Sequence, residues 1–153
     1  MSPEDKLLSL GYSLTKPTTP LANYVPVKRV GNTLYISGQL SAGPEGLVTG
    51  KLGGDLSVED GQKAAALSAV NILSHIAYTA EIPLENIAGI SKITVLVTAT
   101  PDFAEHHLVA NGASDVLVEV LGGAGRHARA AFGVASLPLN AAVEIDAIVE
   151  IAE

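Results

Sequence analysis

The chain divides into stretches whose apolar residues recur at helical spacing and stretches whose apolar and polar residues alternate. From Val58 to about Ala80, apolar residues return every three or four positions, a spacing typical of an amphipathic helix. The stretch from Phe103 to Leu121 has the same spacing, and the glycines after it favour a helix end. A shorter segment, Pro3–Leu10, also has helical character. The pattern therefore predicts two long helices after one short one.

Strands are predicted before, between and after the long helices. Their expected ranges are Val27–Val30, Thr33–Ser37, Ile87–Thr98, Ala128–Ser136 and Ala142–Ile151. The first two flank Gly31–Asn32, a dipeptide that favours a tight hairpin turn. The third contains the continuous apolar run Ile93–Val97, which is typical of a strand buried on both faces. The last alternates apolar and polar residues, so we expect one of its faces to lie on the core.

This order, β-β-α-β-α-β-β, predicts an α+β fold in which one mixed sheet carries two helices on one face. The chain is expected to form a single domain, residues 1–153, with residues 1–23, including Pro17 and Pro20, as a lead-in. Two helices cover only one face of such a sheet, and the other face also carries apolar residues. Since the simplest cover is a second copy of the chain, we expect a homo-oligomer.

Composition narrows the class of protein. The absence of cysteine excludes disulfides, thiolate metal sites and cysteine nucleophiles. The formal net charge of −7 argues against nucleic-acid binding, which depends on Lys and Arg. No apolar run approaches the about 20 residues that span a bilayer, and the N-terminus lacks a signal-peptide pattern, so we expect a cytoplasmic protein without membrane contact. Adjacent His106 and His107 point in different directions on a helix and are not expected to share a metal ion.

Arg129 and Glu144 are the residues that most suggest chemistry, because each is a charged side chain in a predicted strand rich in small apolar residues. In one interpretation they form a structural ion pair across neighbouring strands. In the other, the planar guanidinium binds a carboxylate with two parallel hydrogen bonds, and the glutamate orients or activates a water beside it. Both interpretations place the two residues close together. Arg126 and His127 are expected on a solvated loop next to Arg129, from which Arg126 could gate a ligand-binding cleft.

Several segments, in their order along the chain, resemble the signatures of one protein family. They are Asn23–Tyr24, Gly31–Asn–Thr–Leu–Tyr–Ile–Ser–Gly–Gln39, Asn71–Ile–Leu, Lys92–Ile–Thr–Val–Leu–Val, Ala128–Arg–Ala–Ala–Phe–Gly–Val–Ala–Ser–Leu–Pro138 and Val143–Glu–Ile145. Together they resemble the RidA/YjgF family, the reactive intermediate deaminases, from about Pro20 to Glu150. The resemblance implies a chorismate-mutase-like fold, a homotrimer with active sites in the clefts between subunits, and no metal or cofactor.

The resemblance also implies an activity and a set of site residues. Members of the founding branch hydrolyse enamines and imines such as 2-aminoacrylate to 2-keto acids and ammonia. The chain is therefore expected to be a hydrolase similar to 2-iminobutanoate/2-iminopropanoate deaminases, acting on a small carboxylate-bearing metabolite. By position, Arg129 matches the arginine that binds the substrate carboxylate, Glu144 the glutamate that positions the attacking water, and Tyr24 a tyrosine of the cleft. The other implied substrate contacts are Ser37, the Gly38 backbone, Asn111 and Ala131.

Three departures from the family pattern indicate a divergent subgroup. Ala131 stands where the best-known members have a cysteine, the segment His106–His127 is longer and contains the loop Gly122–His127, and the lead-in before Tyr24 is extended. These departures leave open a second function, that of a trimer that binds 2-keto acids or other small carboxylates without turnover. Endoribonuclease activity, a label that some members carry, is disfavoured by the acidic charge and by the lack of a suitably placed histidine pair.

Overall fold

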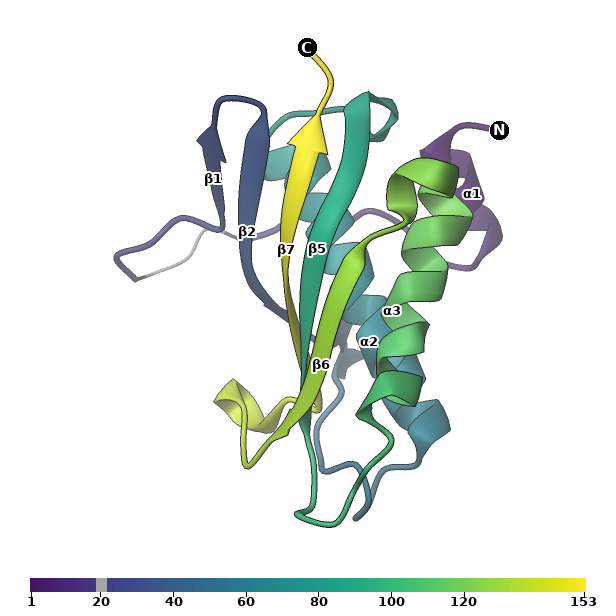
Figure 1. The fold of residues 1–153 in the computed structure, drawn as a ribbon, viewed down its shortest axis with the longest axis vertical. Coiled ribbons are helices and arrows are strands. Elements are labelled where there is room, and N and C mark those ends of the chain that lie inside the picture. Colours follow the sequence, from purple (N-terminus) through teal and green to yellow (C-terminus); the bar gives the residue numbers. More distant parts are fainter. Residues whose placement is uncertain (19–21) are drawn as a thin grey trace.

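A mixed sheet with two long helices on one face organises residues 1–18 and 22–153, the part of the chain that this computed structural model describes (Figure 1). Pro20, which belongs to the predicted lead-in, lies outside these residues. The helices are α1 (Pro3–Ser9), α2 (Val58–Ser74) and α3 (His106–Leu121). The main sheet has the order β1-β2-β7-β5-β6, formed by β1 (Val27–Val30), β2 (Thr33–Leu40), β5 (Ile87–Thr98), β6 (Ala128–Val134) and β7 (Val143–Ile151). The predicted α+β class is confirmed; an additional small hairpin consists of β3 (Ala42–Gly43) and β4 (Gly46–Leu47).

The two long helices lie close to their predicted positions. Ser57 caps α2: its hydroxyl accepts the backbone N–H of Asp60, and the Asp60 carboxylate accepts the N–H of Ser57. A π-helical turn, His75–Thr79, extends the helical path of α2 to the predicted end near Ala80. Helix α3 begins three residues later than predicted, because the chain first makes a turn in which the Phe103 N–H donates to the Thr100 carbonyl.

The order of the last strands differs from the expected one. Strand β6 pairs only with β5, to which it runs parallel, whereas β7 lies between β2 and β5 and is antiparallel to both. The connection from β5 through α3 to β6 is a crossover, which is how parallel neighbours are joined. Consequently β6 and β7 are not neighbours in the sheet, and the predicted pairing of the strands that carry Arg129 and Glu144 is wrong.

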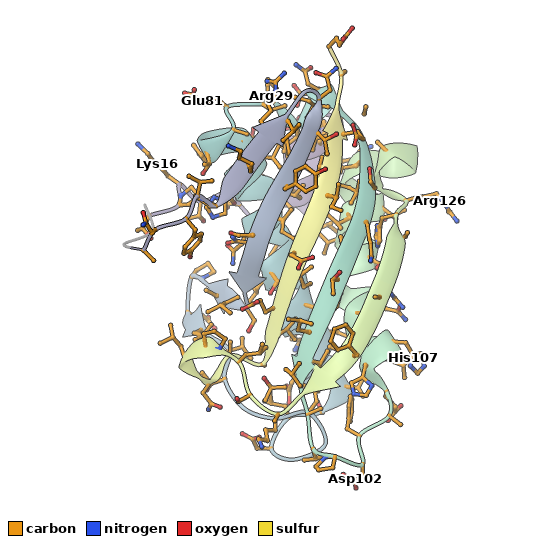
Figure 2. The ribbon with its side chains drawn as sticks, turned by 60° about the vertical axis from the view of Figure 1, so that its left-hand side comes forward. Lys16, Arg29, Glu81, Asp102, His107 and Arg126 are labelled. Carbon is orange, nitrogen blue, oxygen red and sulfur yellow. The ribbon has the colours of Figure 1, made fainter. Side chains whose placement is uncertain are left out.

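One face of the sheet lies on the core, and the other is open. The buried residues of β7 alternate as predicted, with Val143, Ile145, Ala147, Val149 and Ile151 beneath the helices. In β5, Ile93, Val95 and Val97 are fully buried, but Thr94 and Leu96 between them are only half-buried. The expectation that this strand is buried on both faces is therefore wrong for the single chain. Figure 2 shows the open face in front of the helices; Tyr35 and Phe132 on it are each 47% exposed.

The N-terminal segment packs against the helix layer. Helix α1 contacts α3, and its Leu7 is fully buried in the core, whereas the next residue, Leu8, is 54% exposed. Ser2 caps this helix in the same way as Ser57 caps α2. The predicted lead-in thus includes a helix that contributes to the core.

Candidate functional site

Arg129 lies on β6 and is held by α3. Its register partner on β5 is Ile93, which faces the helices, so the arginine side chain lies on the same side of the sheet. Its Nη1 donates to Asn111 Oδ1 at 2.9 Å and to Ser114 Oγ at 3.1 Å, and its Nη2 donates to the His107 carbonyl at 3.3 Å. All three acceptors are on α3, and Asn111 and Ser114 are three residues apart, on the same face of that helix.

The contacts of Arg129 leave part of its guanidinium available. Of the five N–H donors of an arginine, the three contacts with α3 use three, so the Nε–H and one Nη2–H remain. Among residues 1–18 and 22–153, no carboxylate lies within ion-pair distance of this exposed side chain. A fixed guanidinium with two unused N–H groups is suited to a ligand carboxylate. Ala131 lies two residues farther along β6, on the same face as Arg129.

Glu144 lies on the open face of the sheet, against the backbone of Gly38. Two residues of β2, Ser37 and Gly38, lie between the paired positions Ile36 and Gln39, whereas only Asp146 lies between their partners on β7. This β-bulge brings the Gly38 backbone so close to Glu144 that a Cβ at position 38 would overlap Oε2 and lie 2.7 Å from Cδ. A glycine at position 38 is therefore required for the observed position of the carboxyl.

The environment of Glu144 changes its acidity. Burial raises the pKa of the Glu144 carboxyl above its ordinary value, because a charged carboxylate is poorly solvated there. The negative charge of Asp146, which lies on the same face of β7, raises the pKa of Glu144 further. A carboxyl whose pKa is raised in this way is better able to donate a proton and to accept it back near neutral pH.

Tyr24, Ser37 and Gly38 line one hollow of about 350 Å³ beside β2. Tyr24 is 58% exposed, so its ring is accessible to a ligand or to another protein surface. Residues of α2 form the opposite wall, and the segment Thr15–Thr18 borders it. The hollow adjoins the Gly38 backbone, on which the Glu144 carboxyl lies.

The predicted site residues therefore form two separate groups. Arg129, Asn111 and Ala131 lie at the β6 edge, whereas Glu144, Gly38, Ser37 and Tyr24 lie around β2 and β7. Arg129 is aligned with Ile93 of β5 and Glu144 with Leu96 of β5; because these are three residues apart, the two side chains point to opposite faces. Two strand spacings and three residues of rise separate their Cα atoms by about 14 Å.

This separation corrects both interpretations of Arg129 and Glu144 within one chain. A cross-strand ion pair between them is impossible, because β5 lies between their strands. Equally, one small substrate cannot contact both residues of the same chain. The prediction that Arg129 and Glu144 lie close together in one chain is wrong, because β6 and β7 are not neighbouring strands.

The roles of two residues near the arginine were not identified from the sequence: Ser114, which contacts Arg129, and His127, which contacts Ser114. Ser114 accepts a hydrogen bond from Arg129, and its position three residues after Asn111 on the predicted helix was the available signal. His127 was expected on a solvated loop, but it is half-buried, with Nε2 at 2.8 Å from Ser114 Oγ and Nδ1 at 2.6 Å from the Gly125 carbonyl. The expectation for His127 is therefore wrong, whereas Arg126 is exposed.

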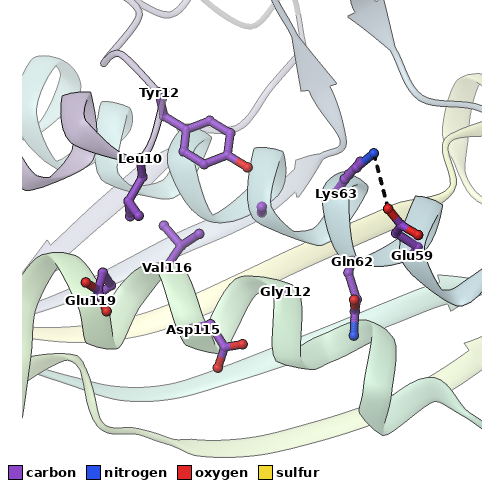
Figure 3. A pocket seen from close by; sticks show the side chains of 10 residues that line it. Leu10, Tyr12, Glu59, Gln62, Lys63, Gly112, Asp115, Val116 and Glu119 are labelled. Atoms are coloured by element: carbon purple, nitrogen blue, oxygen red, sulfur yellow. Dashed lines mark ion pairs between the residues drawn. The ribbon is translucent and has the colours of Figure 1, made fainter.

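A second hollow, of about 400 Å³, lies elsewhere on the molecule, between α2, α3 and the segment that follows α1 (Figure 3). Leu10, Tyr12 and Val116 line it, together with exposed charged side chains that include the ion pair Lys63–Glu59 at 3.7 Å. None of the predicted site residues borders it.

The described part of the chain holds neither a cluster of metal-ligating side chains nor a membrane-spanning helix. In residues 1–18 and 22–153, no three His, Asp or Glu side chains are grouped closely enough to hold a metal ion. Over the same residues, none of the helices has the length and apolar character needed to cross a bilayer.

The sheet order and its single helix layer define a chorismate-mutase-like fold, and comparison with known proteins agrees. A family model described as "YjgF/chorismate_mutase-like, putative endoribonuclease" matches residues 4–151. The chain belongs to the RidA/YjgF family, so the resemblance inferred from its sequence motifs is confirmed.

Individual relatives differ in how closely they match the chain. It is 43% identical to Protein TCP17 of Trypanosoma cruzi over 147 residues, which cover 95% of this chain and 91% of that protein. It is 49% identical to Atu1372 of Agrobacterium tumefaciens, whose crystal structure matches 97% of this chain and 93% of that one with a TM-score of 0.91. RidA of an Antarctic Psychrobacter is 31% identical, with a TM-score of 0.55 over 89% of this chain and 94% of that one. In shape, the chain is closer to Atu1372 than to this RidA.

Proposed function

We propose that the protein is an enamine/imine deaminase that hydrolyses 2-aminoacrylate-type intermediates to 2-keto acids and ammonia, acting as a cytoplasmic homotrimer without a cofactor. The observation that supports this function best is the Arg129 guanidinium, which α3 anchors through three hydrogen bonds while two N–H groups remain for a carboxylate. Every substrate of this class carries a carboxylate next to the reacting carbon. Arg129 would bind this group and so hold the reacting carbon in place.

The separation of the two groups of residues supports a site between copies of the chain. Arg129 and Asn111 of one subunit would face Glu144, Gly38 and Tyr24 of the next, because no small substrate spans the two groups within one chain. Such a contact joins different surfaces of the two subunits, and in a trimer it closes into a ring with three equivalent clefts. The partly exposed Tyr35 and Phe132 on the open face favour such an association.

The Glu144 carboxyl is suited to both proton transfers of the reaction. In its protonated form it can give a proton to C3 of the enamine, which yields the 2-imine. As a carboxylate it can then accept a proton from the water whose oxygen bonds to C2. The hydroxyl proton of the resulting carbinolamine then passes to the nitrogen, the C2–N bond breaks as the C2=O bond forms, and the nitrogen leaves as ammonia, so one water is consumed for each keto acid and ammonia released. The raised pKa of Glu144 favours this exchange of roles near neutral pH.

The activity is tested by coupling the protein to a serine or threonine dehydratase and following keto-acid release in the presence of semicarbazide, which traps the intermediate. We expect the protein to accelerate release, Arg129→Ala to abolish the effect, and Arg129→Lys to fail as well because an ammonium lacks the planar pair of donors. Glu144→Gln should be slower by a factor of about 10²–10⁴. If wild-type protein leaves release unchanged but is stabilised against heat by 2-oxobutanoate, the proposed activity is wrong and the function is carboxylate binding.

The location of the site is tested by mixing two inactive variants. Arg129→Ala and Glu144→Gln subunits, refolded together in equal amounts, should regain about a quarter of wild-type activity, because one cleft in four then receives an intact arginine from one subunit and an intact glutamate from the other. Each variant refolded alone is the control. A mixture that stays inactive, although mass spectrometry shows mixed trimers, would contradict a site between subunits.

A further inference from the structure

The glycine-rich loop after α3 brings His127 to the residues that hold Arg129. Helix α3 ends at Leu121, and the turn Gly122–Gly125 folds back onto its last turns. Gly125 is buried so close to this helix that a Cβ there would overlap the Leu117 carbonyl oxygen. Only glycine permits this approach, and it places the half-buried His127 ring beside Ser114. The loop thus adds a histidine to the surroundings of the arginine.

The direction of each hydrogen bond in this cluster can be assigned. The Gly125 carbonyl can only accept, so His127 Nδ1 carries a proton and donates it over 2.6 Å. In the neutral ring, Nε2 is then an acceptor, and the Ser114 hydroxyl donates to it over 2.8 Å. The lone pairs of the Ser114 oxygen remain free to accept the Nη1–H of Arg129 at 3.1 Å. The bonds therefore form one continuous chain from the Arg129 guanidinium through Ser114 and His127 to the Gly125 carbonyl.

We infer that Ser114 and His127 are positioning residues for substrate binding: with the Gly125 carbonyl they form a hydrogen-bond relay that fixes the Arg129 guanidinium for a carboxylate. This inference rests on the proposed function of Arg129. Because His127 accepts the serine proton, the serine oxygen presents its lone pairs to the guanidinium and holds Nη1 on α3. The Nε–H and the remaining Nη2–H are thereby kept pointing away from α3.

The relay is distinguished from a merely structural contact by its effect on KM. The carboxylate remains bound to Arg129 both before and during the reaction, so loosening the arginine weakens both states equally. Ser114→Ala should therefore raise KM about tenfold, the size expected for a hydrogen bond to a charged group, and leave kcat within about threefold. Ser114→Thr, which keeps the hydroxyl, should restore a KM near that of wild type.

His127 is tested with a matched neighbour. His127→Phe, which keeps a ring but has no acceptor, should raise KM as Ser114→Ala does. Arg126→Ala removes an exposed side chain of the same loop and should leave KM unchanged. If Ser114 and His127 only stabilised the fold, their substitution would instead lower the fraction of folded protein. It would then decrease kcat and the melting temperature and leave KM unchanged, and that result would overturn the inference.

A spectroscopic measurement tests the relay without any substrate. Long-range ¹H–¹⁵N spectra at about pH 8, where an ordinary histidine is neutral, should show His127 protonated at Nδ1 and unprotonated at Nε2. The spectrum of His127→Phe assigns the signal among the four histidines. The opposite tautomer would overturn the relay whatever the activity. Conversely, a wild-type protein that neither turns over 2-aminoacrylate nor binds 2-oxobutanoate would refute the proposed function, whereas wild-type KM in an active Ser114→Ala would refute the relay alone.

Discussion

Gly38→Ala is a direct test of whether the position of the Glu144 carboxyl matters for activity. The added methyl would overlap Oε2 and lie 2.7 Å from Cδ, although ordinary contacts of a Cβ begin at 3.4 Å. Cδ must therefore retreat by about 0.7 Å, and the nearer Oε2 by about 1 Å. The obstacle is the end of a flexible side chain, so Glu144 can move without displacing the backbone of β2 or β7. The substitution thus moves one functional group while keeping its chemistry.

The expected loss of activity follows from the size of this movement. Misplacing a reacting group by about 1 Å can decrease a rate about 100-fold, so a retreat of about 0.7–1 Å should decrease kcat by about 10- to 100-fold. Stability should change little. Gly38 does not have a positive φ, so alanine is compatible with its conformation, and the entropy lost from the unfolded state favours the variant by about 0.4–1 kcal/mol. For a chain of this size, the melting temperature should therefore shift by no more than about 4 °C.

The assay compares Gly38→Ala with Gly123→Ala in the coupled deaminase reaction. Gly123 also lacks a positive φ, and no atom lies within 4 Å of its added Cβ, so the control should turn over like wild type. Thermal unfolding of both variants checks the fold. If Gly38→Ala is folded and keeps wild-type kcat, the contact between the Gly38 backbone and Glu144 does not position a catalytic group, and the proposed role of Glu144 must be abandoned.

Three further predictions concern the acidity of Glu144 and the core. Because the pKa of Glu144 is raised in the folded state, its charge destabilises the fold as pH rises through and above the ordinary carboxyl range. Glu144→Gln should therefore be more stable than wild type in urea unfolding at about pH 7. This gain should vanish at about pH 3, below the ordinary carboxyl pKa, because the glutamate is then protonated in both states. Since Asp146 contributes to the raised pKa, Asp146→Asn should move the Glu144-dependent limb of the kcat/KM profile to lower pH; a limb that stays in place would contradict this coupling. Leu7→Ala should lower the free energy of unfolding by about 2–5 kcal/mol, because Leu7 is fully buried. Leu8→Ala, at an exposed position of the same helix, should change it by no more than about 0.5 kcal/mol in the same urea titration. Equal effects would show that α1 is not part of the core.

The helices and the faces of the strands could be predicted from the sequence, because both depend on local periodicity. The spacing of apolar residues over Val58–Ala80 identified α2, and the alternation in Val143–Ile151 identified the buried face of β7. Periodicity shows which side of a strand is buried, but it does not show which strand lies beside it. The position of β7 between β2 and β5 depends on contacts between distant segments, so the sequence pattern wrongly suggested that β6 and β7 are neighbours.

The contacts around Arg129 likewise depend on segments that are distant in the sequence, so local patterns predicted only part of them. Asn111 could be proposed because a family pattern includes a helix asparagine, and in the structure its side chain accepts a hydrogen bond from Arg129. The burial of His127 could not be predicted, because it depends on the close approach of Gly125 to the Leu117 carbonyl. A glycine-rich segment after a helix is usually a solvated loop, and only tertiary packing shows that this one folds back on α3.

The strand order also implies that association of subunits would change both the pKa of Glu144 and the set of residues around it. Glu144 lies on the open face with Tyr35 and Phe132, which a single chain leaves partly exposed. A neighbouring subunit that covers this face would remove more water from the carboxyl and raise its pKa further, in the direction that burial within one chain already favours. In the proposed trimer the same subunit would also supply the Arg129 guanidinium, whose positive charge acts in the opposite direction and lowers the pKa of a nearby carboxyl. Arg129→Ala removes that charge, so we expect the Glu144 carboxyl of this variant to titrate at higher pH in the assembled protein than in dilute, dissociated subunits, and an equal titration in both forms would show that the contact between subunits does not cover the glutamate.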